Sequence, residues 1–386
     1  MNYFSISEGK GSIPELDGFR GIAILFVLLR HAVRPIYEEH GTLFLFGTWD
    51  LATPFLNGWM GVDLFFVLSG FLITYHLINH WPDKFSGSFL LSYCKKRILR
   101  IFPAYYACVL IVAFGWIPFY QPNIINIGDE IFKHLVFMQD YSGTNLVSAF
   151  WSLGVEVKFY LLCPFVLLCL KMFSRQRLLD FLLLLAIAPL VLRISTMYAY
   201  QDIIQNYPMF FWIVRAPAHL AFDGLWLGSI CACIYHWNLY NTGHKHTNAL
   251  LLLGLIVLMY CLFSYSWFDE ELFWASSIVL ALVPLSFSLV IMITLRSETF
   301  FTGILKSGWL RFFARISYSV YLTHLLILPL CLDILSKLVS SMNASPILQF
   351  LILLPIFLLM SILSGLVLHL LIEKPFLLIK ERVVIR

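Results

Sequence analysis

Apolar residues along the chain come in blocks of about twenty, as in residues 178–194, 250–264 and 348–371, with short polar segments between them. At 1.5 Å per residue, about twenty helical residues cross the roughly 30 Å hydrocarbon core of a bilayer. The pattern therefore predicts about ten membrane-spanning helices. Their expected ranges are 18–36, 58–79, 98–118, 149–170, 178–197, 210–236, 249–267, 274–295, 316–335 and 348–372.

The composition supports this interpretation, because 60% of the residues are hydrophobic, 12% are charged and the mean hydropathy is +0.84. Soluble globular domains average about 25% charged residues, so a soluble fold is excluded. The predicted loops are short, and we expect one all-α, polytopic membrane domain over residues 1–386 with no appended soluble domain. Glu15, Asp17 and Arg20 interrupt the start of the first block, so we expect no cleavable signal peptide.

Lysine and arginine fall unevenly between alternate loops. With the N-terminus inside, the inner loops hold most of them, whereas the outer loops hold only Arg34, Lys133 and Lys337. Cytoplasmic loops retain positive charge, so we expect both termini in the cytoplasm. The net charge of +4 follows from basic loops beside an anionic leaflet and requires no nucleic-acid partner.

The eight cysteines fall mostly within apolar blocks and show no metal-ligand spacing with histidines. We expect them to be small buried hydrophobic residues instead of disulfides, and we expect no metal site. No internal repeat is evident along the chain, which weighs against a secondary transporter, because many transporters are built from repeats.

The first predicted helix carries Arg20 and His31, which are eleven positions apart. In a helix this spacing places both on one face, about 16 Å apart along the axis. A fixed cation at the cytoplasmic end and an imidazole near the membrane midplane suit a long ligand with an anionic end and a reactive far end. The alternative is that Arg20 anchors the helix at the interface and His31 makes a polar contact between helices.

A basic cluster begins the third predicted helix. Arg97 and Arg100 lie at i and i+3 on one face, directly after Lys95 and Lys96. Such a pair can grip phosphate groups with bidentate hydrogen bonds. Basic clusters at inner helix ends more often serve only to orient the chain in the membrane.

The fourth predicted helix opens with polar residues. Ser152 is placed to cap it, and Glu156 lies about one turn inside, facing Tyr160 at i+4. The helix dipole favours a carboxylate near a helix N-terminus. A structural role for Glu156 is therefore as consistent with the sequence as a catalytic role.

Other charged residues inside the membrane also need partners. Arg215, His219 and Asp223 follow one another at i, i+4 and i+8 of the sixth predicted helix, and mutual pairing is the favoured interpretation. Asp63 in the second helix could pair with a basic group, while Gly70 suits close helix packing.

The ninth predicted helix places Tyr318, Tyr321 and His324 at three-residue steps along one side. This polar stripe either lines a wet cavity or forms hydrogen bonds between helices.

Taken together, these segments resemble the bacterial acyltransferase 3 family of membrane O-acyltransferases. The matching motifs are LDGFRG with an arginine and a histidine separated by ten residues, GVDLFFVLSGFLIT, RILRIFP, WSLGVEVKFY, ISYSVYLTH and LIEKPF. They occur in family order from about residue 14 to residue 378. The resemblance implies about ten spanning helices in the bacterial inner membrane and transfer of an acyl group, usually acetyl from acetyl-CoA, to a glycan hydroxyl.

The resemblance further implies that His31 is the essential catalytic residue and that Arg20, Arg97 and Arg100 bind the acyl-CoA donor. A neutral His31 could act as a general base or carry the acyl group transiently. Glu156, Tyr321 and His324 are further candidate catalytic residues. Glu156 or Tyr321 could orient the imidazole or stabilise charge.

The expected partners are acyl-CoA, as substrate and not as a permanently bound cofactor, and a hydroxyl acceptor such as O-antigen or exopolysaccharide, which could be lipid-linked. Succinyl is an alternative to acetyl. A transporter that uses the same charged residues as a substrate or proton pathway is the rival hypothesis from another class. A protein that only senses or scaffolds is less consistent with the intact Arg20, His31 and arginine pair.

Overall fold

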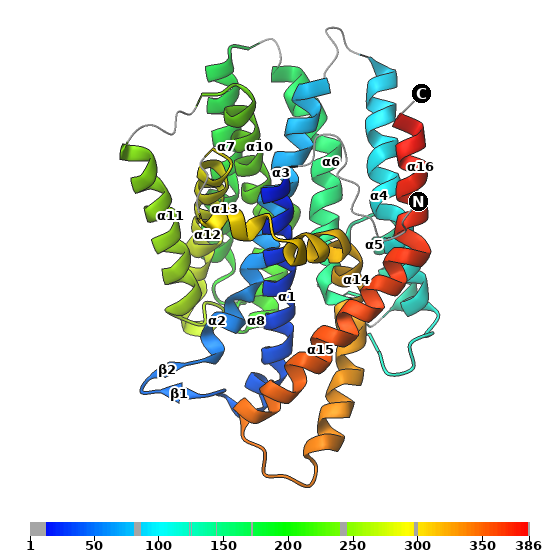
Figure 1. Ribbon diagram of the computed structural model, residues 1–386. Helices are drawn as coiled ribbons and strands as arrows, with labels where there is room; N and C mark the ends of the chain where they lie inside the picture. Colours follow the sequence, from blue (N-terminus) through cyan, green and yellow to red (C-terminus); the bar gives the residue numbers. More distant parts are fainter. Residues whose placement is uncertain are drawn as a thin grey trace.

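The computed structural model describes residues 13–80, 86–122, 124, 126–143, 145–170, 173–239, 245–296 and 300–384. Both chain ends, with Lys10 and Arg386, and the loop lysines Lys84 and Lys171 lie outside these ranges. The described chain is almost entirely helical, with one short hairpin (Figure 1). It confirms the all-α, membrane-like fold.

The first part of the chain forms the centre of the molecule and one edge, which carries the basic residues Arg97 and Arg100. Its elements are α1 (Pro14–His40), the hairpin β1 (Leu45–Phe46) and β2 (Trp49–Asp50), α2 (Ala52–Leu56), the 3₁₀ turn η1 (Asn57–Trp59), α3 (Met60–His80), α4 (Gly87–Ala113), α5 (Ile127–Leu135), the 3₁₀ turns η2 (Gln139–Tyr141) and η3 (Ser148–Phe150), and α6 (Trp151–Leu170).

The second part of the chain, after α6, supplies the remaining helices and turns. Its elements are α7 (Arg175–Tyr200), α8 (Tyr207–Phe210), the π-helical turn η4 (Phe211–Arg215), α9 (Ala218–Ala221), α10 (Asp223–His236), α11 (Lys245–Phe263), the 3₁₀ turn η5 (Glu270–Leu272), α12 (Phe273–Thr294), α13 (Phe300–Leu305), α14 (Gly308–Val339), α15 (Pro346–Leu368), the π-helical turn η6 (His369–Glu373) and α16 (Lys374–Val384).

Local signals explain several boundaries. Helix α1 begins with Pro14 in its first turn and ends at His40. The next residue, Gly41, has a left-handed backbone (φ 72°), and its N–H donates to the Tyr37 carbonyl. Helix α4 begins at Gly87, because the Ser86 side chain accepts a hydrogen bond from the Phe89 N–H. The helix therefore begins before residue 98, where the predicted spanning range starts.

Six helical segments in the described residues are long and apolar enough to cross a membrane. They are Ala52–His80, Ser148–Cys169, Arg175–Tyr200, Glu270–Thr294, Gly308–Val339 and Pro346–Lys380. The apolar stretch of α11, Leu252–Phe263, is shorter. Helices α1 and α4 are each 27 residues long, but they carry the arginines that lower their hydropathy.

The sixth predicted helix is not continuous. Pro217 has no N–H to donate, and the chain passes from η4 through Pro217 into α9 and then α10. This break removes the regular i, i+4 spacing on which the predicted pairing of Arg215, His219 and Asp223 depended.

Helix α1 runs through the middle of the bundle and packs against α3, α14 and α15, while α4 and α16 lie side by side at one edge (Figure 1). Helices α3 and α10 pack closely at Gly70 and Gly228. A Cβ at Gly70 would meet the Leu225 carbonyl, and one at Gly228 would meet the Val67 carbonyl. The packing role predicted for Gly70 is confirmed.

Candidate active site

A narrow cavity of about 90 Å³ lies where α1, α3, α4, α6 and α14 meet, and we call it the Arg20 cavity. Its polar lining includes Arg20, Arg97, Arg100, Glu156, Tyr318 and Tyr321. The basic residues singled out on two predicted helices therefore face one space. Three arginines and a single carboxylate among its described lining residues give the cavity an excess of positive charge, which suits a polyanion.

A second cavity, of about 430 Å³, lies beside the other half of α1, and we call it the His31 cavity. Its polar lining includes Arg30, His31, Arg34, Tyr207, Arg215 and Tyr321. Ligand pockets typically enclose about 300–1,000 Å³, so the volume suits a small ligand group.

The two cavities are neighbours, because Val62 and Tyr321 line both of them. Arg20 faces one cavity and His31 faces the other, at a separation that helical geometry sets at about 16 Å along α1. A ligand that reaches from one cavity into the other would pass between Val62 and Tyr321.

His31 lies against a second histidine from α14. The ring centroids of His31 and His324 are 5.0 Å apart, with 52° between the ring planes. His31 is half-buried and lines the cavity, whereas His324 is fully buried behind it. His31 and His324 are both candidate catalytic residues. Of the two, only His31 is among the described residues that line the His31 cavity.

The backbone of α14 holds the His324 ring. Its Nδ1 lies 2.8 Å from the Tyr321 carbonyl oxygen and 3.2 Å from the Val320 carbonyl oxygen, so Nδ1 carries the proton and donates. Its Nε2 has no hydrogen-bond partner among the described residues. His324 is thus an oriented ring that supports one side of His31.

Tyr321 forms part of the wall between the cavities and contacts the start of α6. Its hydroxyl donates to the Ala149 carbonyl at 2.8 Å and lies 2.7 Å from the Ser152 hydroxyl. The prediction that Ser152 caps α6 is wrong, because the helix already begins at Trp151 after η3. The tyrosine stripe therefore both lines a cavity and forms hydrogen bonds between helices.

Glu156 faces Tyr160, as predicted, and accepts hydrogen bonds from the Tyr160 hydroxyl and from the Ser69 hydroxyl, the latter at 2.6 Å. Both Glu156 and Tyr160 line the Arg20 cavity. The expectation that Glu156 orients the His31 imidazole does not fit this placement, since His324 and not Glu156 packs against His31. Glu156 instead faces the arginines.

The charged residues of the broken sixth segment pair with other helices, so the prediction of mutual pairing is wrong. Arg215 forms a bidentate ion pair with Asp63, with N–O distances of 2.9 and 2.8 Å. This pair confirms the basic partner expected for Asp63. Arg193 on α7 pairs with Asp223 at 2.6 Å. Each pair is buried and joins two helices.

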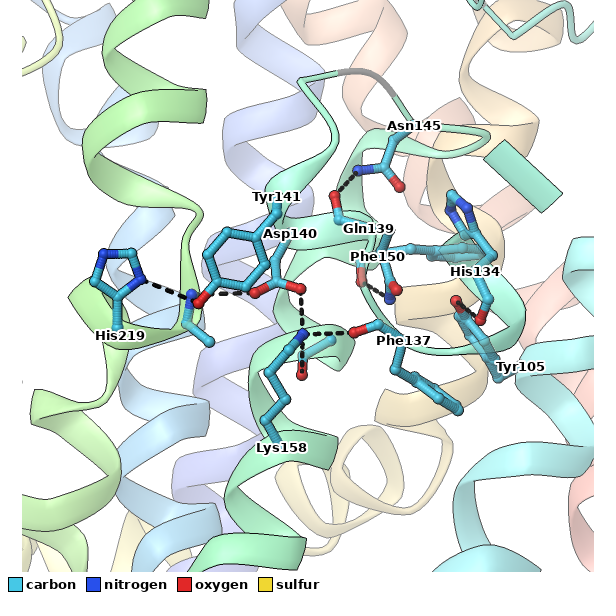
Figure 2. Close-up of polar contacts among 12 residues, drawn as sticks. Tyr105, His134, Phe137, Gln139, Asp140, Tyr141, Asn145, Phe150, Lys158 and His219 are labelled. Atoms are coloured by element: carbon cyan, nitrogen blue, oxygen red, sulfur yellow. Dashed lines mark hydrogen bonds and ion pairs between the residues drawn. The ribbon is translucent and has the colours of Figure 1, made fainter. Parts of the chain in front are cut away.

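His219 belongs to a polar network that joins the loop before α6 to α9 (Figure 2). The Tyr141 hydroxyl lies 3.0 Å from His219 Nδ1, and the two rings are parallel. The adjacent Asp140 carboxylate accepts from the Ala218 N–H at 3.0 Å and from Lys158. Burial raises the pKa of the Asp140 carboxyl, and the Lys158 ammonium opposes that rise.

Two polar residues that line the His31 cavity were not among the candidate site residues predicted from the sequence. Arg30 precedes His31 on α1, and Tyr207 begins α8 far along the chain. Arg30 could have been noticed as an arginine inside an apolar helix, which needs a partner or a function. Tyr207 has no local sequence signal, because only the fold brings α8 to α1.

The sequence pattern that defines the acyltransferase 3 family, described as an acyltransferase domain, matches residues 13–366. This range contains both cavities and every residue described above as lining them. The chain belongs to the acyltransferase 3 family and is a multi-pass membrane protein.

Three named relatives show what the chain is similar to. The peptidoglycan O-acetyltransferase OatA of Listeria monocytogenes is 30% identical over 182 residues, which are 43% of this chain and 26% of that protein. A Staphylococcus aureus protein named "Putative O-acetyltransferase" is 28% identical over 178 residues, again 43% of this chain and 26% of the relative.

The Bacillus subtilis protein named "Putative peptidoglycan O-acetyltransferase YrhL" is 28% identical over 203 residues, which are 48% of this chain and 28% of that protein. The matched part of the chain therefore spans about a quarter of the length of these relatives. No solved structure matches the chain significantly.

Proposed function

We propose that this protein is a membrane O-acyltransferase that moves an acetyl group from acetyl-CoA to a hydroxyl of a cell-envelope glycan. The observation that carries the proposal is the pair of adjacent cavities. One is lined by Arg20, Arg97 and Arg100, and the other by His31. Family membership supports the reaction class, and the names of the relatives support acetyl as the acyl group.

On the donor side, the arginines of the Arg20 cavity bind the phosphates of CoA. Arg97 lies over the rings of Tyr93 and Tyr160, with its Cζ 5.4 and 5.3 Å from their centroids. These cation–π contacts support the guanidinium from the apolar side, and Arg97 lines the cavity in which the anion would bind. Glu156 lies in the same lining and offsets part of the positive charge.

The thioester then lies near Val62 and Tyr321, between the two cavities, with the acceptor hydroxyl in the His31 cavity. Neutral His31 removes the hydroxyl proton as the oxygen attacks the thioester carbonyl carbon. The C–S bond breaks, and His31 returns the proton to the departing CoA sulfur. This is general acid–base catalysis, worth about 10²–10⁴ in rate. His324 is a positioning residue, since it acts through His31, and Tyr321 shapes the passage.

The charge pattern supports a topology of about ten spans with both termini in the cytoplasm of a bacterium, in its inner membrane. In this orientation the Arg20 cavity opens toward cytoplasmic acetyl-CoA, and the His31 cavity faces the other side of the membrane. One membrane domain over residues 1–386 would then contain both substrate sites.

The acceptor belongs to the envelope. Two of the relatives carry peptidoglycan in their names, so peptidoglycan or its lipid-linked precursor joins O-antigen and exopolysaccharide as a candidate acceptor. Comparing the O-acetyl content of each glycan in cells with and without the protein would identify it.

The direct test is an assay with purified protein in proteoliposomes supplied with radiolabelled acetyl-CoA and envelope glycan fractions. We expect release of CoA and incorporation of label into alkali-labile esters only when both substrates are present. Gradient-driven movement of a solute without consumption of thioester would contradict the proposal and favour a transporter.

A further inference from the structure

The His31 cavity has a surplus of positive charge. Its described lining residues include three arginines, Arg30, Arg34 and Arg215, and no aspartate or glutamate. Arg215 is matched by its bidentate ion pair with buried Asp63. The charges of Arg30 and Arg34 therefore decide what the cavity attracts.

Arg30 has only neutral partners among the contacts of its guanidinium. One nitrogen donates to the Leu56 carbonyl, and another donates to the Tyr207 hydroxyl at 3.1 Å. The group also lies over the Phe268 ring, 5.6 Å from its centroid. With 8% of its surface exposed, Arg30 is a buried cation that is hydrogen-bonded and lacks a carboxylate.

A buried charge is costly unless an opposite charge compensates it. Carbonyl, hydroxyl and ring contacts lower that cost but leave the formal charge in place. An anionic group of a ligand in the cavity would complete the set of partners, since arginine binds carboxylate and phosphate with paired hydrogen bonds.

Arg34 adds a second cation one helical turn further along α1, on the same side as Arg30. Its only close carboxylate among the described residues is Glu38, at 2.6 Å, and that side chain is 58% exposed. Glu38 and Asp269 line a smaller neighbouring pocket that shares Arg30 and Arg34. Arg34 therefore lies between the solvent-facing carboxylates and the His31 cavity.

We propose that the His31 cavity selects an acceptor with an anionic group, a carboxylate or a phosphate, which Arg30 and Arg34 bind beside the hydroxyl that is acylated. This inference rests on the proposed function and names the substrate class of its acceptor site. His31 lines the same cavity as the two arginines, so the anion and the reacting hydroxyl are held within one sugar residue or two adjacent ones.

The probes are three sugars built on one ring. N-acetylglucosamine is the neutral reference, N-acetylmuramic acid adds a carboxylate, and N-acetylglucosamine 1-phosphate adds a phosphate. We measure the binding of each to purified detergent-solubilised protein by calorimetry, and separately acetyl transfer to each from acetyl-CoA. We expect at least one anionic sugar to bind about tenfold or more tightly than the neutral one, as a charge-assisted hydrogen bond allows.

The two anionic arms identify the source of the charge. Tighter binding of the muramic acid alone indicates a carboxylate-bearing glycan. Tighter binding of the phosphate alone indicates the phosphate of a lipid-linked precursor. Equal binding of all three sugars overturns the inference.

Arg34→Gln tests the assignment with the least risk to folding, because Arg34 is partly exposed. It should remove most of the anion preference, measured as the ratio of the affinities for the anionic and the neutral sugar. Glu38→Gln is the matched control, since it breaks the same ion pair but keeps the cation, and it should retain or strengthen the preference. Equal loss in both variants would show that the pair is only structural and would overturn the inference.

Arg30→Gln and Arg30→Lys complete the series. Arg30→Lys should keep part of the preference because the charge remains, whereas Arg30→Gln should lose it. If the anion preference holds but no sugar is acetylated, the proposed function fails. If transfer occurs without any preference for charge, the function stands and this inference fails.

Discussion

The ring of His324 on α14 lies with its centroid 5.0 Å from that of His31 on α1, and its Nδ1–H is held by two backbone carbonyls of its own helix. The His31 imidazole thus packs against a second imidazole, whose Nδ1 proton is held in place by the backbone. This contact restricts the orientation of the His31 ring on the side that faces α14.

His31→Ala should abolish acetyl transfer, with a fall in kcat of about 10²–10⁴, and should leave CoA affinity within about twofold of the wild type. The imidazole acts at the reacting centre and adds little to donor binding. Arg20→Ala should weaken CoA binding as well as turnover. CoA titration, transfer rate and thermal stability measured on the same preparations separate these effects, and a folded His31→Ala protein with normal transfer would refute the assignment.

His324→Ala should lower kcat by about 10- to 100-fold, because His31 loses the ring that supports it. The KM for acetyl-CoA should stay unchanged, since His324 is not among the described residues that line the Arg20 cavity. His324→Asn keeps a side-chain N–H near the Tyr321 and Val320 carbonyls, so it should recover part of the rate. A purely structural role of His324 predicts instead that thermal stability and activity fall together. It also predicts that the KM for acetyl-CoA and the KM for the acceptor both change.

Changing Arg97 and Arg100 together to Gln should raise the KM for acetyl-CoA by about tenfold or more, because charge-assisted contacts with phosphate are lost. The double Lys variant should recover only partly, since lysine lacks the bidentate geometry. Lys95 and Lys96 belong to the same basic cluster of α4 but are not among the described residues lining the cavity. Their double Gln variant is the matched control and should leave KM near the wild-type value.

Asp63→Asn should destabilise the protein by on the order of 3 kcal/mol, because it leaves Arg215 buried without its carboxylate. Thermal unfolding in detergent would measure the loss. Asp333→Asn removes the exposed pair between Asp333 and Lys337 and should change stability by less than about 1 kcal/mol. Similar losses of stability in the two variants would contradict the expectation that the buried ion pair contributes more to stability than the exposed one.

Reporter fusions test the proposed topology. A reporter after Arg386 and one near Lys245 should report the cytoplasm, and one near Asp269 should report the opposite side, because basic loops remain inside. An external location for the C-terminal fusion would mean that the number of spans is odd.

Properties that depend on neighbours along the chain could be predicted from the sequence. Long apolar blocks must form helices in a membrane, because every backbone polar group needs an internal partner there. Helical periodicity likewise placed Arg20 and His31 on one side of α1 and brought Glu156 to Tyr160, since these relations depend only on 3.6 residues per turn.

Relations between helices depended on the tertiary structure. Asp63 with Arg215 and His31 with His324 are joined across long stretches of chain, and only packing selects such partners from several equivalent charged or polar residues. Pro217 broke a helix that hydrophobicity alone predicts as continuous, and this break redirected Arg215 and Asp223 to other helices. Helical periodicity fixes the direction of a side chain about its own axis, whereas the residue it meets is decided by how the helices pack.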